Sequence, residues 1–195
     1  MSEKYTDDII AIEFDLFDKV NNVGGRAACQ DDFTTFEVMR GAQFDAWNEE
    51  MRASYLEDLT AARNAGRNLV MEKYAYMTGY DYMGEDEGFE QKCKLVASIS
   101  ASMLEDTFEL LGRYPNVMRH SRPIGSGSGG AVAIDSYLPC ELMTYSVRTL
   151  ELMSRYIEAL HIVGTNLTER IHENIAQRYG FDSLDAMETR LSEIR

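Results

Sequence analysis

The sequence predicts an all-α protein: a single-domain helical bundle of about six to seven helices. Apolar residues recur every three or four positions along most of the 195-residue chain, as they do on the buried face of a helix. No stretch alternates apolar and polar residues for more than a few positions, as a half-buried strand would. The length suits one domain with a full core, and 45% hydrophobic with 27% charged residues is ordinary for a folded protein.

The first part of the chain is predicted to form three helices followed by a turn. The first helix covers roughly residues 4–22, where apolar side chains recur at helical spacing. The second is a long helix over roughly 34–63, and Thr34-Thr35-Phe36-Glu37 at its start has the order of a capping box. A shorter helix follows over 69–77, and the polar, glycine-rich stretch from Gly79 to Gly88 predicts a turn.

The second part adds four more helices. They are predicted over residues 90–111, 138–163, 167–179 and 184–194. Asp182 or Ser183 is expected to cap the last of them, because a short polar side chain before a helix accepts a hydrogen bond from its first turn.

Residues 114–136 form the one long stretch without helical periodicity. They contain Pro115, Pro123 and the glycine- and serine-rich run Gly125–Gly130. The run lacks the Lys-Ser/Thr ending of a phosphate-binding loop, so we expect a flexible lid instead. Neither flank alone has an evident complete core, so we place this loop inside one domain spanning residues 1–195.

Two similar runs indicate an internal duplication of a helix hairpin. Gly66-Arg67-Asn68-Leu69 and Gly164-Thr165-Asn166-Leu167 each follow a long predicted helix and precede a short one. A true duplication would place Glu37 and Glu141 at equivalent positions on helices that face a central cleft. The alternative is that helix ends reuse Gly and Asn for local reasons.

Charge and composition exclude several classes of partner. The net charge of −14, from 19 basic and 33 acidic residues, argues against nucleic acids and anionic membranes, which bind basic faces. No apolar stretch has the length of a membrane-spanning helix, and the polar, acidic start of the chain is unlike a signal peptide. Cys29, Cys93 and Cys140 are few and widely spaced, which indicates reduced thiols in a cytoplasmic protein.

The segment Asn21–Asp32, which we call the corner, holds the densest group of reactive side chains. Cys29 precedes a predicted helix start, where the helix dipole lowers a thiol pKa, so Cys29, Asp31 and Asp32 are the candidate catalytic residues, in nucleophilic or acid–base roles. Arg26 suits an anionic group, because its planar guanidinium binds a carboxylate with two hydrogen bonds. The structural alternatives are a buried cysteine, an aspartate that caps the next helix, and an arginine that pairs with an aspartate.

A ligand pocket is expected where the corner meets the helix that carries Trp47 and the start of the helix at residues 137–146. A local basic group just before the glycine-rich loop, which includes Arg122, could draw an anionic ligand toward this pocket. The candidate ligand-binding residues are Arg26, Gln30, Trp47, Arg122, Glu141 and Tyr145. The nature of any cofactor is left open.

A transition-metal site is not expected. Di-iron helical bundles use two Glu-x-x-His motifs, and this chain offers one, from Glu169 to His172. It has three histidines in total, His120, His161 and His172, so the second motif cannot be completed.

The sequence resembles an uncharacterised bacterial family, domain-of-unknown-function family 4125. The first motif consists of Glu13–Phe17, Val20–Asp32, Thr35–Arg40 and Gln43–Trp47. The second half contributes Arg122-Pro123, Tyr137-Leu138, Glu141-Leu142, Thr144–Ser146 and Tyr179–Phe181. The resemblance spans nearly the whole chain and implies one compact domain, but it implies no activity.

The preferred hypothesis is therefore a small-molecule enzyme or binding protein with its pocket at the corner. The alternative is a helical adaptor, in which the corner is architectural and the acidic surface binds a protein partner. A homodimer is left open in both cases.

Overall fold

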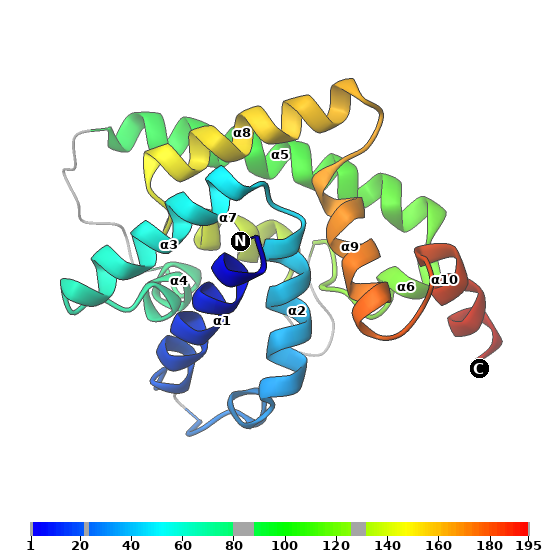
Figure 1. Ribbon diagram of the computed structural model, residues 1–195, viewed down its shortest axis with the longest axis horizontal. Coiled ribbons are helices and arrows are strands. Elements are labelled where there is room, and N and C mark those ends of the chain that lie inside the picture. Colours follow the sequence, from blue (N-terminus) through cyan, green and yellow to red (C-terminus); the bar gives the residue numbers. More distant parts are fainter. Residues whose placement is uncertain (1, 22–23, 80–87, 126–131, 195) are drawn as a thin grey trace.

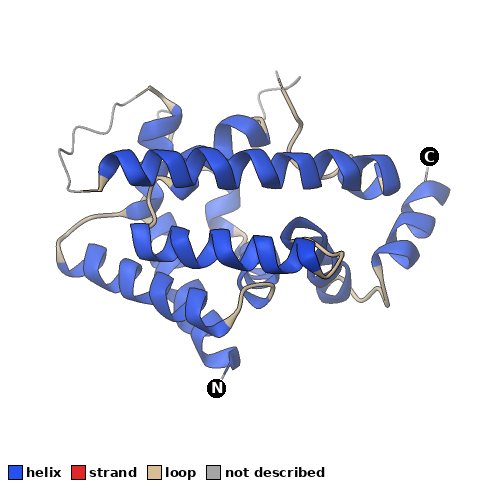
Figure 2. Ribbon diagram, turned by 90° about the horizontal axis from the view of Figure 1, so that it is seen from above, coloured by secondary structure: helices blue, strands red, loops and turns tan. Residues whose placement is uncertain are grey.

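The computed structural model describes residues 2–21, 24–79, 88–125 and 132–194, and every regular element in these residues is a helix (Figure 2). The helices are α1 (Ser2–Asp18), the 3₁₀ helix η1 (Ala28–Asp31), α2 (Phe33–Asp45), α3 (Glu49–Asn64), α4 (Leu69–Met77), α5 (Phe89–Arg113), α6 (Pro115–Met118), α7 (Ile134–Leu142), α8 (Val147–Ile162), α9 (Leu167–Arg178) and α10 (Leu184–Glu193). The all-α prediction is confirmed. The predicted number of six to seven helices is wrong, because this part of the chain forms ten α-helices.

Two predicted long helices are each interrupted, the first near its middle and the second near its start, and a capping side chain explains each break. The Asn48 side chain accepts a hydrogen bond from the Met51 backbone N–H at 2.9 Å and starts α3. Ser146 does the same for α8 through the Thr149 N–H at 3.2 Å. Apolar spacing continues across both breaks, so periodicity alone predicted one helix where there are two.

Two other helix starts were predicted with mixed success. Asp32 caps α2 by accepting from the Thr35 N–H at 3.0 Å, so the helix begins earlier than the predicted capping box. Ser183 caps α10 through the Ala186 N–H at 3.1 Å, which decides between the two candidates named from sequence.

The segment predicted to be irregular, 114–136, is partly helical. It contains the single turn α6 and the first residues of α7. Residues 126–131 of the proposed lid, and residues 80–87 of the predicted turn, lie outside the described residues.

The helices pack around α7, which lies in the middle of the molecule (Figure 1). The two long helices α5 and α8 lie side by side along the long axis. Helix α1 packs against α2 and α3, and α2 packs against α9. Helix α10 lies at one end and contacts α6 and α9.

The core consists of two apolar clusters. The larger cluster joins α1–α5 and α7–α9, and it includes the fully buried Phe44, Met51 and Leu150. The smaller cluster lies where α5, α6, α9 and α10 meet, and it includes Leu110 and Leu184.

The internal duplication is supported by matched local geometry. Gly66 and Gly164 both have positive φ, of 70° and 75°, which favours glycine, and Asn68 and Asn166 follow as the caps of α4 and α9. The packing also matches, because α1 with α3 corresponds to α5 with α8, and α2 with α9 corresponds to α7 with α4.

This correspondence corrects one predicted equivalence. Glu141 lies five residues before Ser146, the cap of α8, and Gln43 lies five residues before Asn48, the cap of α3. The residue that matches Glu141 is therefore Gln43, not Glu37.

Candidate functional site

The corner between α1 and α2 is built around the buried side chain of Gln30. Its Nε2 donates to the backbone carbonyls of Phe17 at 2.8 Å and Val20 at 3.1 Å. Its Oε1 accepts from the Ala27 N–H at 2.9 Å. One amide thus satisfies carbonyls at the end of α1 that the helix itself leaves without partners.

The charged corner residues also bind within the protein. The exposed Arg26 donates to Asp31 Oδ1 at 2.8 Å, to Asp18 Oδ1 at 2.6 Å and to the Gln30 carbonyl at 3.0 Å. The hydrogen bonds that Arg26 donates to Asp31 and Asp18 raise its pKa. The hydrogen bond from Thr35 lowers the pKa of Asp32, as expected for a helix cap.

Cys29 is exposed, so the structural alternative of a buried cysteine is wrong. Its neighbours Asp31 and Asp32 are engaged as an Arg26 partner and as the α2 cap. The catalytic roles predicted for Cys29, Asp31 and Asp32 stay predictions.

A cavity of about 420 Å³ lies between α2, α5, α7 and α9, away from the corner. Its apolar lining consists of Met39, Met103, Met118, Ile134, Leu138, Leu142, Met153, Ile171 and Ile175. Its polar lining includes four of the predicted ligand-binding residues, Trp47, Arg122, Glu141 and Tyr145. The other two, Arg26 and Gln30, do not line it.

A buried charge network forms one wall of this cavity. Arg40 binds Glu13 with two hydrogen bonds of 2.6 Å, from Nε and Nη2. Its Nη1 donates to Glu141 Oε1 at 2.8 Å and to Gln43 Oε1 at 2.7 Å. One guanidinium therefore joins α1, α2 and α7 through carboxylates that are both almost fully buried.

Two tyrosines complete the coordination of these carboxylates. Tyr55 donates to Glu13 Oε1 at 2.6 Å, and Tyr145 donates to Glu141 Oε1 at 2.9 Å. Burial, reinforced by the carboxylate that each one binds, raises the pKa of both hydroxyl groups far above the ordinary value. Both tyrosines are therefore held as neutral donors.

The charges in the network fix its protonation. Burial alone would raise the pKa of Glu141, but Arg40 and Lys73 outweigh it and hold that pKa far below the ordinary carboxyl range. Burial would lower the pKa of Lys73, and Glu141, with Nζ 3.6 Å from Oε2, more than compensates. The carboxylate and the ammonium are therefore both charged.

Tyr137 lies at the end of the network and lines the cavity. Lys73 Nζ donates to its hydroxyl oxygen at 2.6 Å, and the Arg122 guanidinium stacks 3.8 Å from its ring centroid. The stack is a cation–π contact that holds Arg122 over one face of the ring.

Two buried polar atoms on the cavity wall have no hydrogen-bond partner within the described residues. They are Nε1 of Trp47 and Oγ1 of Thr168, in residues that are 2% and 5% exposed. Buried polar groups are almost always paired, because an unpaired one loses its hydrogen bonds to water without replacement.

His172 is the histidine best held at the cavity. Its Nδ1 lies 2.8 Å from the Thr168 carbonyl and its Nε2 3.2 Å from Ser121 Oγ. Burial lowers its pKa below the ordinary value, so the ring is neutral at pH 7. The short hydrogen bonds fix the orientation of the ring beside Thr168.

The site residues that sequence reasoning missed are Arg40, Gln43, Tyr137, Thr168 and His172 at the cavity. It also missed Glu13 and Lys73 in the adjoining charge network. A weak signal existed in α2, where Arg40 and Gln43 are three positions apart and so share one face of the helix. Nothing local indicated that Glu13 and Glu141 would converge on Arg40, because they are 27 and 101 positions away.

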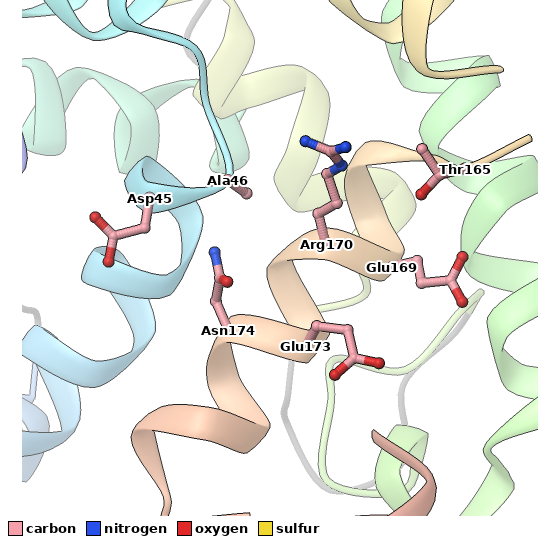
Figure 3. A pocket seen from close by; sticks show the side chains of 7 residues that line it. All are labelled: Asp45, Ala46, Thr165, Glu169, Arg170, Glu173 and Asn174. Atoms are coloured by element: carbon pink, nitrogen blue, oxygen red, sulfur yellow. The ribbon is translucent and has the colours of Figure 1, made fainter. Parts of the chain in front are cut away.

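Figure 3 shows another pocket, of about 440 Å³, between the end of α2 and α9. Its side chains spread apart: Asp45 points away from Glu169 and Glu173. Asn174 donates to a carbonyl of α2 at 3.0 Å, and Glu173 accepts from the first N–H of α10 at 3.1 Å. These groups join helices to one another, so the α7 cavity is the stronger candidate site.

The described residues contain neither a metal-holding group nor a membrane-spanning helix. No three His, Cys, Asp or Glu side chains there are placed to hold a metal ion, so Glu169 and His172 are not part of such a group. None of the helices in that part of the chain has the length and apolar character to cross a membrane.

Comparison with known proteins identifies a family without an activity. A sequence profile for the family described as "Protein of unknown function (DUF4125)" matches residues 3–189. No curated protein and no solved structure matches the chain. Since the match covers nearly the whole chain, it confirms the resemblance noted from the motifs, and this protein belongs to the DUF4125 family.

Proposed function

We propose that this protein binds a small, mainly apolar molecule in the cavity between α2, α5, α7 and α9. The carrying observation is that Trp47 and Thr168, two residues that line the cavity, each hold a buried polar atom, Nε1 and Oγ1, with no partner among the described residues. A ligand that hydrogen-bonds to them would recover the desolvation cost of each group, which is on the order of 1–3 kcal/mol.

The shape and lining of the cavity agree with this role. Its volume of about 420 Å³ is typical of small-molecule sites, which are mostly apolar with a few fixed polar groups. The rigid charge network holds Tyr145 and Glu141 in place at its wall, so the site is preorganised before a ligand enters.

The test uses the protein purified from its own host and compares its native and denatured masses. Ile171→Phe fills the cavity, and Ile162→Phe makes the same change at a residue that is 84% exposed. We expect a bound molecule in the wild type and in Ile162→Phe, and its loss in Ile171→Phe. A bound molecule retained in Ile171→Phe would place it elsewhere and contradict the proposal.

A second readout covers a ligand lost during purification. Trp47 is the only tryptophan in the chain, so its fluorescence reports directly on the cavity. If the protein carries no bound mass, and no compound from a panel of small apolar molecules changes this fluorescence, the proposal fails.

A helical adaptor remains the second candidate function, and the architecture of the corner favours it. Arg26 and Gln30 donate hydrogen bonds that hold the end of α1 against η1, so the corner has an architectural role. In this second function the acidic surface binds the partner. A stoichiometric protein partner in the native mass, with no small molecule, would support the adaptor. We also propose that residues 1–195 form a single domain. The three free cysteines favour a reducing, cytoplasmic compartment for it.

A further inference from the structure

The polar groups on the cavity wall differ in whether they are already occupied. Glu141 Oε1 accepts from Arg40 at 2.8 Å and from Tyr145 at 2.9 Å, and its Oε2 faces Lys73 at 3.6 Å. This carboxylate therefore has little capacity to bind a ligand donor or a ligand cation. Gln43 Oε1 is likewise occupied by Arg40 at 2.7 Å.

Two of the groups that remain act as donors. Trp47 Nε1–H can only donate, and it has no acceptor among the described residues. Tyr137 receives a hydrogen bond from Lys73 on its oxygen, which leaves its own proton for another acceptor. A ligand that satisfies this wall must bring acceptors.

The charge balance points the same way. Arg40 and Lys73 offset Glu13 and Glu141 in the buried network. Arg122, stacked on Tyr137 at the cavity wall, adds a positive charge beyond this balance. In a chain with a net charge of −14, this is an unusual place to concentrate cations.

We propose that the ligand is an organic carboxylate with an apolar body, whose anionic group binds at the Arg122–Tyr137 pair. This inference rests on the proposed function and adds the chemical class of the ligand. The apolar body lies against the methionine, leucine and isoleucine lining.

The experiment compares matched acids, alcohols and amines that share an octyl, phenylpropyl or cyclohexylmethyl body. Binding is followed by Trp47 fluorescence. We expect the acid of at least one body to bind about tenfold or more tightly than its alcohol, because a charge-assisted hydrogen bond adds on that order of affinity. The amine is expected to bind most weakly, and added salt should weaken only the acid.

Two arginine variants provide the matched control. Arg122→Gln should remove the preference for the acid, measured as the ratio of the acid's affinity to the alcohol's affinity in the same variant. Arg119→Gln, a nearby exposed arginine that donates to Asn116 at 2.8 Å and does not line the cavity, should change neither. Tyr137→Phe should weaken the acid more than the alcohol, and its circular dichroism and melting temperature show whether the fold is kept.

The outcomes separate this inference from the proposed function. Equal binding of acid and alcohol, or a preference for the amine, overturns the carboxylate while cavity binding stands. A preference for the acid that survives Arg122→Gln overturns the Arg122–Tyr137 site. If no member of any set binds, and the protein from its host carries no molecule, cavity binding itself is overturned.

Discussion

At the scale of single residues, Gln30 shows how one buried amide can organise a turn. It donates to Phe17 and Val20 at the end of α1, and it accepts from Ala27 at the start of η1. The reactive side chains around it are exposed, whereas Gln30 itself is 1% exposed. Its hydrogen bonds therefore lie where water cannot replace them.

We expect Gln30→Ala to lower the free energy of unfolding by about 1–3 kcal/mol, because it strips partners from several buried backbone groups at once. The neighbouring Cys29→Ala removes an exposed thiol and should leave stability nearly unchanged. Urea denaturation followed by circular dichroism measures both. Equal midpoints for the two variants would show that the corner is not held by this amide.

Glu141 shows the cost of burying charge. It is held by Arg40, Tyr145 and Lys73, and replacing it with Ala would leave the buried Lys73 ammonium without a carboxylate and Arg40 with Glu13 alone. We expect Glu141→Ala to lower the free energy of unfolding by about 3–5 kcal/mol. Urea denaturation again gives the value.

The control for Glu141→Ala is an ion pair on the surface of the protein. Glu57 pairs with Arg148 at 2.9 Å, and both side chains are about two-thirds exposed, at 66% and 68%. Glu57→Ala should cost about 0–1 kcal/mol. A cost for Glu141→Ala that is no larger than this would contradict the structural role of the network.

At the scale of helices, the sequence predicted positions better than ends. All seven predicted segments fall on helices, since the apolar faces of α1, α5 and α9 follow helical spacing closely. The breaks at Asn48 and Ser146 were missed, because Trp47 and Tyr145 keep the apolar spacing through each turn. The polar caps were the signal, but a single Asn or Ser is also common inside a helix.

The site was harder to predict than the helices for a physical reason. Arg26, Cys29 and two aspartates close together in sequence suggest chemistry, yet Arg26 binds one aspartate and the other caps α2. The cavity gathers its polar groups from α2, α7 and α9, through contacts that no local pattern contains. Trp47, Arg122, Glu141 and Tyr145 line one cavity, which lies away from the corner, and their role in ligand binding stays a prediction.

Two asparagine caps in the first half of the chain give a prediction about helices. Asn48 and Asn68 both cap a helix by accepting from an N–H, at 2.9 and 3.0 Å. Asn68 also donates from Nδ2 to the Leu16 carbonyl at 2.8 Å, which joins α4 to α1.

We expect Asn48→Ala to cost about 1 kcal/mol, as for an ordinary cap, and Asn68→Ala to cost more. Asn68→Asp keeps the acceptor and loses the donor, so it should fall between the wild type and Asn68→Ala. Thermal denaturation measures the series. If Asn68→Asp equals the wild type, the bond to Leu16 contributes nothing to stability.

At the scale of the whole molecule, the two apolar clusters divide the stability unequally. The larger cluster surrounds the charge network and spans eight helices, α1–α5 and α7–α9. The smaller cluster is held by a few apolar contacts and by Glu188 of α10, whose carboxylate reaches across to the start of α6. We therefore expect α6 and α10 to open before the rest of the protein.

Glu188 makes this expectation testable. Its carboxylate accepts from the backbone N–H groups of Asn116 at 3.0 Å and Val117 at 2.9 Å, and from the Asn116 side chain at 2.6 Å. Burial alone would raise the pKa of Glu188, but these hydrogen bonds outweigh it and lower that pKa below the ordinary value. Because the folded-state pKa is the lower one, the stabilisation is complete above the unfolded pKa, near 4.3. It is lost as the pH falls through the folded pKa.

We expect Glu188→Ala to speed amide hydrogen exchange in α6 and α10 by about tenfold at neutral pH, which corresponds to about 1.4 kcal/mol of opening free energy. Exchange in α3 and α8 of the larger cluster should not change. Glu193→Ala removes an exposed carboxylate of the same helix and should have no effect. Below pH 4 the wild type should approach the variant, because protonation removes the same acceptor. Faster exchange throughout the chain would show instead that the two clusters open as one cooperative unit.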